Sequence, residues 1–290
     1  MSRSRPGPHR DPRAPRRTPP ASRTGERGAG GDQVEGRRAV AELLAAGRRQ
    51  VVDVWLVAEV EQHPAPVIDR IIELAAARRV PLRRVSAARL AAEARTEAPQ
   101  GVLAHARPLP EVDFDDLCRP VTASTAGGAV TASTAGTPFL LALDGVTDPQ
   151  NLGALLRTAE GAGVTGVVLP RHRAAHVTAT VTKAAAGAVE HVPIAVVGGI
   201  PAALARASEL GLWVLGLDAG ADESLFDLTL ADQPVVVVLG AEGRGLSRLV
   251  RQRCDLMLGI PLRGRLPSLN VSAAGALALF EISRRRPSAG

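Results

Sequence analysis

Short apolar runs alternate with segments of helical periodicity through most of the second half of the chain. Runs of this kind are typical of strands that are buried on both faces of a sheet. They occupy residues 139–143, 164–169, 192–197, 212–217, 235–239 and 256–260. Segments with apolar residues at helical spacing separate them, at 151–162, 177–189, 201–210, 246–254 and 270–284. Strands that alternate with helices predict a parallel α/β sheet, whose ligands bind beyond the carboxyl ends of the strands.

A smaller α/β unit precedes this sheet. The same patterns predict helices at 35–46, 67–78 and 87–94 and strands at 51–57, 80–85 and 102–106. Between the two units the string VTASTAG occurs twice, in an uncharged segment rich in Thr, Ser and Gly. That composition is typical of a flexible linker. We therefore predict an N-terminal domain at 34–118, a linker at 119–137 and a larger domain at 138–290.

Positive charge is concentrated at the N-terminus. The protein has 35 Lys and Arg against 29 Asp and Glu, a formal net charge of +6. The first 30 residues contain eight arginines and only Asp11 and Glu26, so this segment accounts for the whole excess. We expect a disordered Arg/Pro-rich tail over residues 1–33 that binds polyanions without reading their sequence. The alternative is an extension that only keeps the protein in solution.

Several classes of protein are disfavoured by the sequence. No apolar stretch approaches the ~18 residues of a membrane span, and the N-terminus lacks the apolar core of a secretion signal. Cys118 and Cys254 are too few for a disulfide framework or a four-cysteine zinc site. His172 and His176 have no third metal ligand close in sequence. Residues 161–166 fit a dinucleotide-binding pattern in letters only, because they end a helix rather than begin one. We expect a cytoplasmic protein without a metal site.

Polar residues gather in three loops that follow predicted strands. The first loop leads into the string NLGALLR, in which Asn151 belongs to the first turn of a helix and Arg157 lies off the buried stripe of that helix. The two residues are just under two helical turns apart, so both could face one ligand near the start of the helix. The structural alternative is a capping Asn151 and a solvated Arg157.

The second and third loops have chemistry of a similar kind. After the fifth apolar run the chain reads GAEGRG from Gly240, with Glu242 inside a turn whose glycines allow a close approach to a ligand. The third loop, at 261–269, contains Ser268 and is followed by Asn270 at the start of the C-terminal helix. Plain helix capping would also explain these last two residues.

One local excess of positive charge adjoins these loops. It is opposed only by Glu242 and Asp255. Its members are Arg244, Arg248, Arg251, Arg253, Arg263 and Arg265. Such a segment is most often a solvated face, but beside ligand-binding loops it could hold the phosphates of a nucleic acid.

The strings NLGALLR, GAEGRGL and IPL…SLNVS, in this order and spacing, resemble the SpoU/TrmH family of RNA ribose 2′-O-methyltransferases. The likeness is strong over residues 138–286, and the string EGRRAVAELL resembles more weakly the start of the family's N-terminal RNA-binding domain. The resemblance implies a knotted α/β methyltransferase domain that forms a homodimer and binds S-adenosylmethionine. With both domains present, it points to the branch that methylates a guanosine of 23S ribosomal RNA.

The resemblance also implies a set of site residues. The catalytic positions are Asn151, Arg157, Glu242, Ser268 and Asn270, and the cofactor-binding positions are Gly240, Ile260, Leu262 and Leu269. Because a guanidinium stays protonated at neutral pH, we expect Arg157 to hold an RNA phosphate and stabilise the developing alkoxide rather than act as a base. Asn151 would fix Arg157, and Glu242 would hydrogen-bond Arg157 or the ribose.

Two other interpretations remain open at this point. A methyltransferase of the same family could act on transfer RNA or on another ribosomal site. A protein of a different class, a non-catalytic RNA-binding factor for ribosome assembly, could have kept the same fold.

Overall fold

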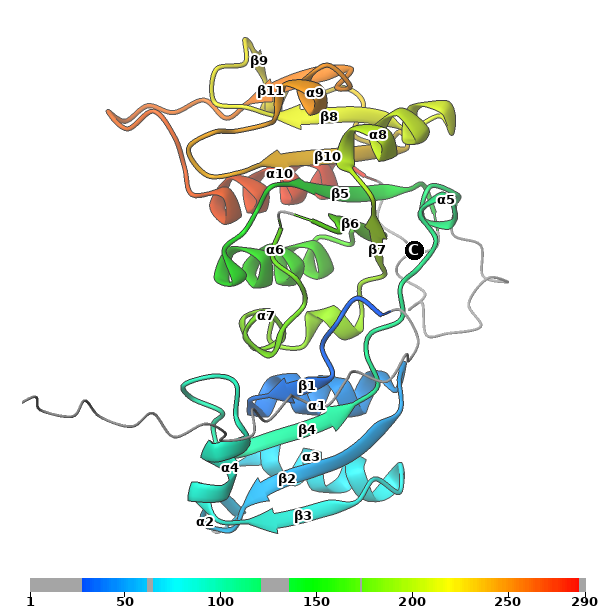
Figure 1. The fold of residues 1–290 in the computed structure, drawn as a ribbon. Coiled ribbons are helices and arrows are strands. Elements are labelled where there is room, and N and C mark those ends of the chain that lie inside the picture. Colours follow the sequence, from blue (N-terminus) through cyan, green and yellow to red (C-terminus); the bar gives the residue numbers. More distant parts are fainter. Residues whose placement is uncertain (1–27, 62–64, 121–135, 173, 287–290) are drawn as a thin grey trace, which may run out of the picture.

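The computed structural model describes residues 28–61, 65–120, 136–172 and 174–286, which form two α/β domains (Figure 1). The larger domain is built on a parallel sheet of seven strands in the order β7-β6-β5-β10-β8-β11-β9. These strands are β5 (Phe139–Asp144), β6 (Gly166–Pro170), β7 (Ile194–Val197), β8 (Trp213–Leu217), β9 (Glu223–Ser224), β10 (Val235–Gly240) and β11 (Leu256–Gly259). The parallel sheet predicted from the alternating pattern is confirmed.

Helices cover both faces of this sheet. Phe139, Leu141 and Leu143 of β5 belong to the core shared with α6, α7 and α10, whereas Leu140 and Ala142 belong to the core shared with α8 and α9. The helices are α6 (Pro149–Gly161), α7 (Ala179–Ala184), α8 (Ile200–Glu209), α9 (Arg248–Arg251) and α10 (Val271–Arg285). Burial on both faces explains why the strands read as continuous apolar runs.

Two predicted helices are shorter than expected. The segment predicted as one helix at 177–189 forms α7 and a separate 3-10 turn, η3 (Ala188–Glu190). The break occurs because Ala186 and Gly187 have φ angles of 52° and 90°, which a right-handed helix cannot contain. The helix predicted at 246–254 is reduced to the four residues of α9.

The smaller domain has a mixed sheet in the order β1-β4-β2-β3, in which β2 and β3 are parallel and the other pairs antiparallel. Its strands are β1 (Gln33–Glu35), β2 (Val51–Val57), β3 (Leu82–Val85) and β4 (Val102–Ala106), and its helices are α1 (Arg37–Ala46), α2 (Ala58–Glu61), α3 (Pro66–Ala77) and α4 (Ala87–Glu93). Apolar side chains of α1 and α3 form its core with β2 and β4. The predicted N-terminal α/β unit is confirmed.

Several short elements are not predicted from the hydrophobic pattern, because two to four residues are too few to show a periodicity. They are β1, α2, α5 (Phe114–Leu117), β9 and η4 (Leu225–Asp227). Among these, α5 also moves a boundary. Leu117 is buried with β5 and α8 of the larger domain, and the Val112 N–H donates to the Ile194 carbonyl at 3.0 Å. Residues 112–118 therefore belong with the larger domain and not, as expected, with the smaller one.

The predicted tail and linker lie mostly outside the described residues, which begin at Gly28 and omit 121–135. The end of the predicted tail is an exception. The Ala29 N–H donates to the Leu109 carbonyl at 2.9 Å, and Gly30 pairs with Val177 of the larger domain. The expectation of disorder is thus wrong for residues 28–33, because their backbone pairs with segments of both domains.

In Figure 1 the smaller domain lies beyond α7, on the α6 side of the large sheet. Contacts of α1 and β1 with α7 and η3 join the two domains. No helix within the described ranges is both long and apolar enough to cross a bilayer.

Candidate active site

A tight glycine turn follows β10 at the centre of the large sheet. The Ala241 and Gly245 backbones bond each other, with N···O distances of 3.1 and 2.9 Å. A Cβ added at Gly240 would lie 2.1 Å from the Gly245 carbonyl carbon, closer than any real contact. Only glycine therefore fits position 240. The turn folds back so that the backbone of Gly245 packs against the end of β10.

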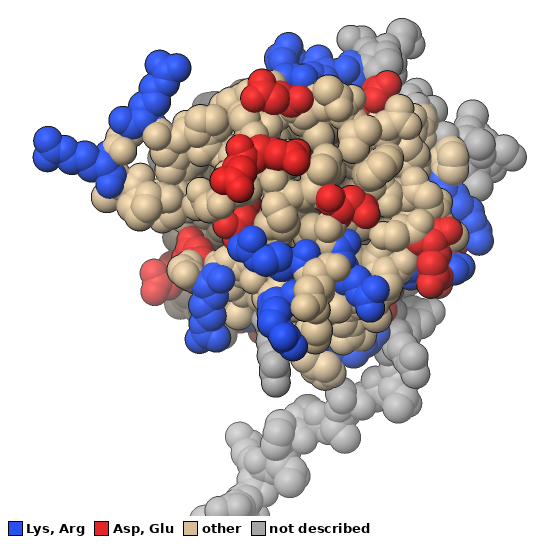
Figure 2. All heavy atoms as spheres, turned by 90° about the horizontal axis from the view of Figure 1, so that it is seen from above, with Lys and Arg blue, Asp and Glu red and all other residues tan. Residues whose placement is uncertain are grey.

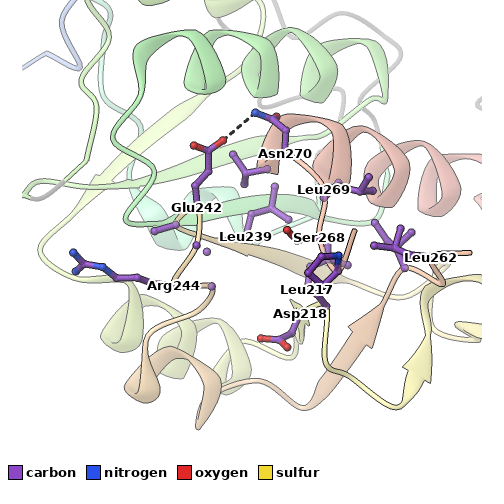
Figure 3. A pocket seen from close by; sticks show the side chains of 18 residues that line it. Leu217, Asp218, Leu239, Glu242, Arg244, Leu262, Ser268, Leu269 and Asn270 are labelled. Carbon is purple, nitrogen blue, oxygen red and sulfur yellow. Dashed lines mark hydrogen bonds between the residues drawn. The ribbon is translucent and has the colours of Figure 1, made fainter. Parts of the chain in front are cut away.

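This turn forms one wall of a cavity of about 650 Å³ (Figure 3). The loop before α10 and the end of β8 form the other walls. All four predicted cofactor positions line it, as do three of the five predicted catalytic positions. These are Gly240, Ile260, Leu262 and Leu269, together with Glu242, Ser268 and Asn270. The glycine turn and the loop before α10 thus meet at one edge of the sheet, because β10 and β11 both end there.

A cluster of amide and carboxylate groups joins the three loops. Glu242 Oε1 accepts hydrogen bonds from Asn151 Nδ2 at 2.8 Å and from Asn270 Nδ2 at 2.9 Å. Asn270 Nδ2 also donates to Asn151 Oδ1 at 3.1 Å. These contacts place the first turn of α6, the glycine turn and the start of α10 in fixed positions relative to one another. The predicted meeting of Asn151, Glu242 and Asn270 is found in the structure.

Capping and site geometry coincide at both helices. Asn270 Oδ1 accepts from the Ser272 N–H at 2.8 Å and so caps α10, while its Nδ2 serves the cluster. Asp148 caps α6 through the Gln150 N–H at 2.8 Å and accepts from Asn151 Nδ2 at 3.2 Å. The structural interpretation of Asn270 as a helix cap is therefore correct, but it describes only one end of the side chain.

A second hollow of about 1020 Å³ lies on the other side of Glu242. It is lined by the loop at 144–148, by the start of α8 and by His172, and it shares Glu242 and Arg244 with the first cavity. The carboxylate of Glu242 therefore stands on the boundary between the two spaces. Its Oε2 accepts no hydrogen bond from the described residues.

The structure does not bring Arg157 to this cluster. Its exposed side chain lines a separate hollow with Arg38 and Arg70 of the smaller domain. The expectation that Arg157 and Asn151 face one ligand is therefore wrong within a single chain, and so is the expected contact between Glu242 and Arg157. The reason is helical geometry: residues seven apart share a face, whereas a separation of six turns the second residue about 120° away and about 9 Å along the axis.

The cavity lining extends beyond the loops that the sequence singles out. Leu217 is the last residue of β8, Asp218 follows it directly, and Leu239 is the penultimate residue of β10. Asp218 lies on the side of the cavity opposite the bond between Glu242 and Asn270 (Figure 3), and it forms an ion pair with Arg251. Asp218 directly follows the apolar run at 212–217, and ligands bind beyond the carboxyl ends of such strands, so the sequence contains a signal for this residue.

The predicted arginine cluster is exposed but not uniformly basic. All six of its side chains lie on residues that are exposed to solvent. Arg251 is already paired with Asp218. Figure 2 shows basic side chains interspersed with acidic ones on the face seen from above. In the described ranges, no group of three His, Cys, Asp or Glu side chains could hold a metal ion.

Comparison with known proteins matches both domains. Residues 138–280 match the model of the SpoU rRNA Methylase family, and residues 33–112 match that of the RNA 2′-O ribose methyltransferase substrate binding domain. The 23S rRNA (guanosine-2′-O-)-methyltransferase RlmB of Pseudomonas aeruginosa is 39% identical over 255 residues, which cover 88% of this chain and 97% of that protein. RlmB of Shewanella oneidensis is 36% identical over 261 residues, 89% and 98% of the two chains.

The fold is also that of solved methyltransferases. The structure of the SpoU methyltransferase AviRb from Streptomyces viridochromogenes in complex with AdoMet superposes with a TM-score of 0.67, at 24% identity, over 87% of this chain and 89% of that one. The expected family is thus confirmed on the sequence and on the fold: this chain is a member of the SpoU rRNA methylase family.

Proposed function

We propose that the protein transfers the methyl group of S-adenosylmethionine to the ribose 2′-hydroxyl of a guanosine in 23S ribosomal RNA. The observation that carries this proposal is the cluster of Asn151, Glu242 and Asn270 on the boundary between two cavities. Relatives that bear the name of this activity align over nearly their whole length, both domains included. A ribosomal substrate would place the protein in the cytoplasm.

The smaller cavity has the size and lining that S-adenosylmethionine requires. Its volume of about 650 Å³ lies in the usual range for small-molecule sites. Leu217, Ile260 and Leu262 offer apolar walls to an adenine ring, and the glycine turn offers backbone groups. Carboxylates at Asp218 and Glu242 suit a ligand with a positive sulfonium and an ammonium group. When bound, the cofactor supplies an electrophilic methyl group and a good leaving group.

We assign the larger hollow to the target nucleotide. It is on the opposite side of Glu242 from the cofactor cavity, so a ribose there would approach the methyl group past this carboxylate. Glu242 Oε2 is available to accept a hydrogen bond from the 2′-hydroxyl, while Oε1 is held by the two asparagines. In the reaction a bond forms between the ribose oxygen and the methyl carbon, the carbon–sulfur bond breaks, and the hydroxyl proton leaves to solvent. The chain contributes mainly by positioning the reactants.

A homodimer would bring an arginine to this site. Leu277 and Phe280 of α10 are 43% and 51% exposed, and Phe280 reaches Gly161 at the end of α6, one turn beyond Arg157. A dimer that buries this apolar patch would have Arg157 near its interface. We therefore propose that the partner subunit's Arg157 holds an RNA phosphate and stabilises the developing alkoxide. We also propose that the chain is knotted through the loops around Gly240 and Ser268.

Transfer of a labelled methyl group tests the proposed function. Purified protein incubated with S-adenosylmethionine and protein-free 23S ribosomal RNA should yield one 2′-O-methylguanosine, mapped by resistance of the adjacent bond to alkali. Methylation of transfer RNA instead would correct the substrate. Binding of ribosomal RNA without any transfer would favour an assembly factor and overturn the proposal.

Mixing of inactive subunits tests the position of Arg157. Arg157→Ala and Glu242→Ala should each be inactive alone. If the arginine acts in the partner's site, each mixed dimer contains one intact site out of two. Random exchange makes about half of the dimers mixed, so the mixture should recover about a quarter of wild-type activity. If the subunits are shown to have exchanged and no activity is recovered, Arg157 does not act in the partner's site. It then acts in the site of its own chain or has no role in the reaction.

A further inference from the structure

A hollow at the boundary of the two domains is lined by side chains from both. Its volume is about 490 Å³, and it is separate from the two cavities at the glycine turn. Three arginines line it: Arg38 on α1, Arg70 on α3 and Arg157 on α6. Each of these residues is exposed. A surface that gathers three guanidinium groups from separate elements has the chemistry that recognises phosphate.

The acidic residues of this hollow do not neutralise it. Glu42 accepts a hydrogen bond from His191 at 3.0 Å and lies 3.9 Å from Arg70. Glu160 lines the hollow, but within the described part of the chain no ion pair joins it to Arg38 or Arg157. These two arginines have no acidic partner within 4 Å among those residues. Their charges are therefore free to meet a ligand.

Contacts between the two domains near this hollow fix their relative position. Arg49 of the smaller domain is paired with Glu190 in the interior, and Gly187 approaches α1 so closely that a Cβ there would lie 2.6 Å from Glu42 Cβ. The separation between Arg38 and Arg157 is thus set by a packed interface rather than by the predicted linker. A ligand that spans both domains would find the arginines already in position, which lowers the entropy lost on binding.

We propose that this interdomain hollow binds the phosphate backbone of the substrate RNA. This inference rests on the proposed function, because it takes RNA as the ligand. Arg38 and Arg70 hold phosphates on the side of the smaller domain, and Arg157 lies on the side of α6, the helix whose first turn contributes Asn151 to the amide–carboxylate cluster. One RNA segment would then contact both domains along α6.

A double substitution tests the hollow without touching the catalytic cluster. Arg38→Gln with Arg70→Gln should raise the KM for protein-free 23S ribosomal RNA at least about fivefold. The slope of log K for RNA binding against log salt concentration should become less negative by ~1–2. The kcat and the affinity for S-adenosylmethionine should stay unchanged. Arg79→Gln with Arg119→Gln is the matched control, because it removes the same charge from exposed residues that do not line the hollow.

A second variant should change the KM for RNA in the opposite direction. Glu160→Gln removes a negative charge from the hollow and should lower the KM for RNA about twofold or more. Melting temperatures of all variants show whether each is folded. The proposal is overturned if the arginine pair and its control give the same KM and salt dependence, or if Glu160→Gln weakens RNA binding. Lack of methyl transfer by the wild-type protein would instead refute the proposed function, and filter binding of the same RNA would still test the hollow.

Discussion

Arg49 and Glu190 form a buried ion pair across the boundary between the two domains. Arg49 Nε lies 3.0 Å from Glu190 Oε2, and Nη2 lies 2.5 Å from Oε1, in a two-pronged contact whose side chains are at most 2% exposed. Arg49 Nη1 also donates to the carbonyls of Gly31 and Arg107. One guanidinium thus ties the end of the N-terminal segment, the end of the small sheet and η3 together.

Removal of one partner of this pair should destabilise the protein strongly. Glu190→Ala leaves the charge of Arg49 buried and unpaired, and we expect it to lower the free energy of unfolding by about 3–5 kcal/mol. Denaturant unfolding followed by circular dichroism measures this change. Glu209→Ala breaks the exposed pair with Arg206 and should cost less than about 1 kcal/mol. Equal effects of the two substitutions would mean that Arg49 is not held by Glu190.

The hydrophobic patterns along the chain predict the fold. They do not predict which side chains from distant parts of the chain contact each other. The parallel sheet and the small α/β domain follow from apolar runs and helical spacing. Asn151, Glu242 and Asn270 could be brought together from sequence because each follows a strand of one parallel sheet. Arg49 and Glu190, in contrast, are 141 residues apart on different domains, and no local pattern pairs them.

The error at Arg157 has a different origin. Its expected position depends on its distance along the helix from Asn151, but a helix fixes the direction of a side chain as strictly as its position along the axis. A separation of six residues sends the two side chains to different faces, so Asn151 is 7% exposed while Arg157 lies in the interdomain hollow. The helix predicted at 177–189 is too long because that prediction passes over Gly187, a poor helix former whose φ of 90° ends the helix and which lies against Glu42 of α1.

Substitutions of Asn270 should separate its capping role from its role in the cluster. Asn270→Ser keeps an oxygen that can cap α10 but removes the amide that donates to Glu242, so we expect near-normal stability and a large loss of methyl transfer. Asn270→Ala loses both and should also lower the free energy of unfolding by about 1 kcal/mol. Thermal unfolding and methylation kinetics of both variants check this. An active Asn270→Ser protein would show that the amide is dispensable.

A methyl group at Gly240 should damage the cofactor cavity. The added Cβ would meet the backbone of Gly245 and Leu246 at 2.1–2.4 Å, so the glycine turn must move. We expect Gly240→Ala to weaken binding of S-adenosylmethionine at least about tenfold, measured by calorimetry, which corresponds to about 1.4 kcal/mol. Gly264→Ala, in the loop before Ser268, is the control, because its Cβ would point into open space. Unchanged affinity in Gly240→Ala would mean that the turn does not form the binding wall.

The two cysteines should be nearly inert in the folded protein. Burial raises the pKa of Cys118 from 9.0 to about 12 and that of Cys254 to about 11. A raised pKa lowers the thiolate fraction at a given pH, and the thiolate is the form that reacts. At pH 8 we expect iodoacetamide to alkylate Cys254 roughly 100-fold and Cys118 roughly 1000-fold more slowly than the unfolded chain, with rates that rise about tenfold per pH unit toward each pKa.

Mass spectrometry of the alkylated peptides measures both rates, and the same chain in denaturant provides the reference. The order of reactivity is part of the prediction, because Cys118 is 4% exposed whereas Cys254 is only partly buried, with its sulfur against Gly216. Rapid labelling of Cys118 at neutral pH would show that α5 opens readily from β7 and α8. In that case residues 112–118 would behave as part of the connection between the domains rather than as part of the larger domain.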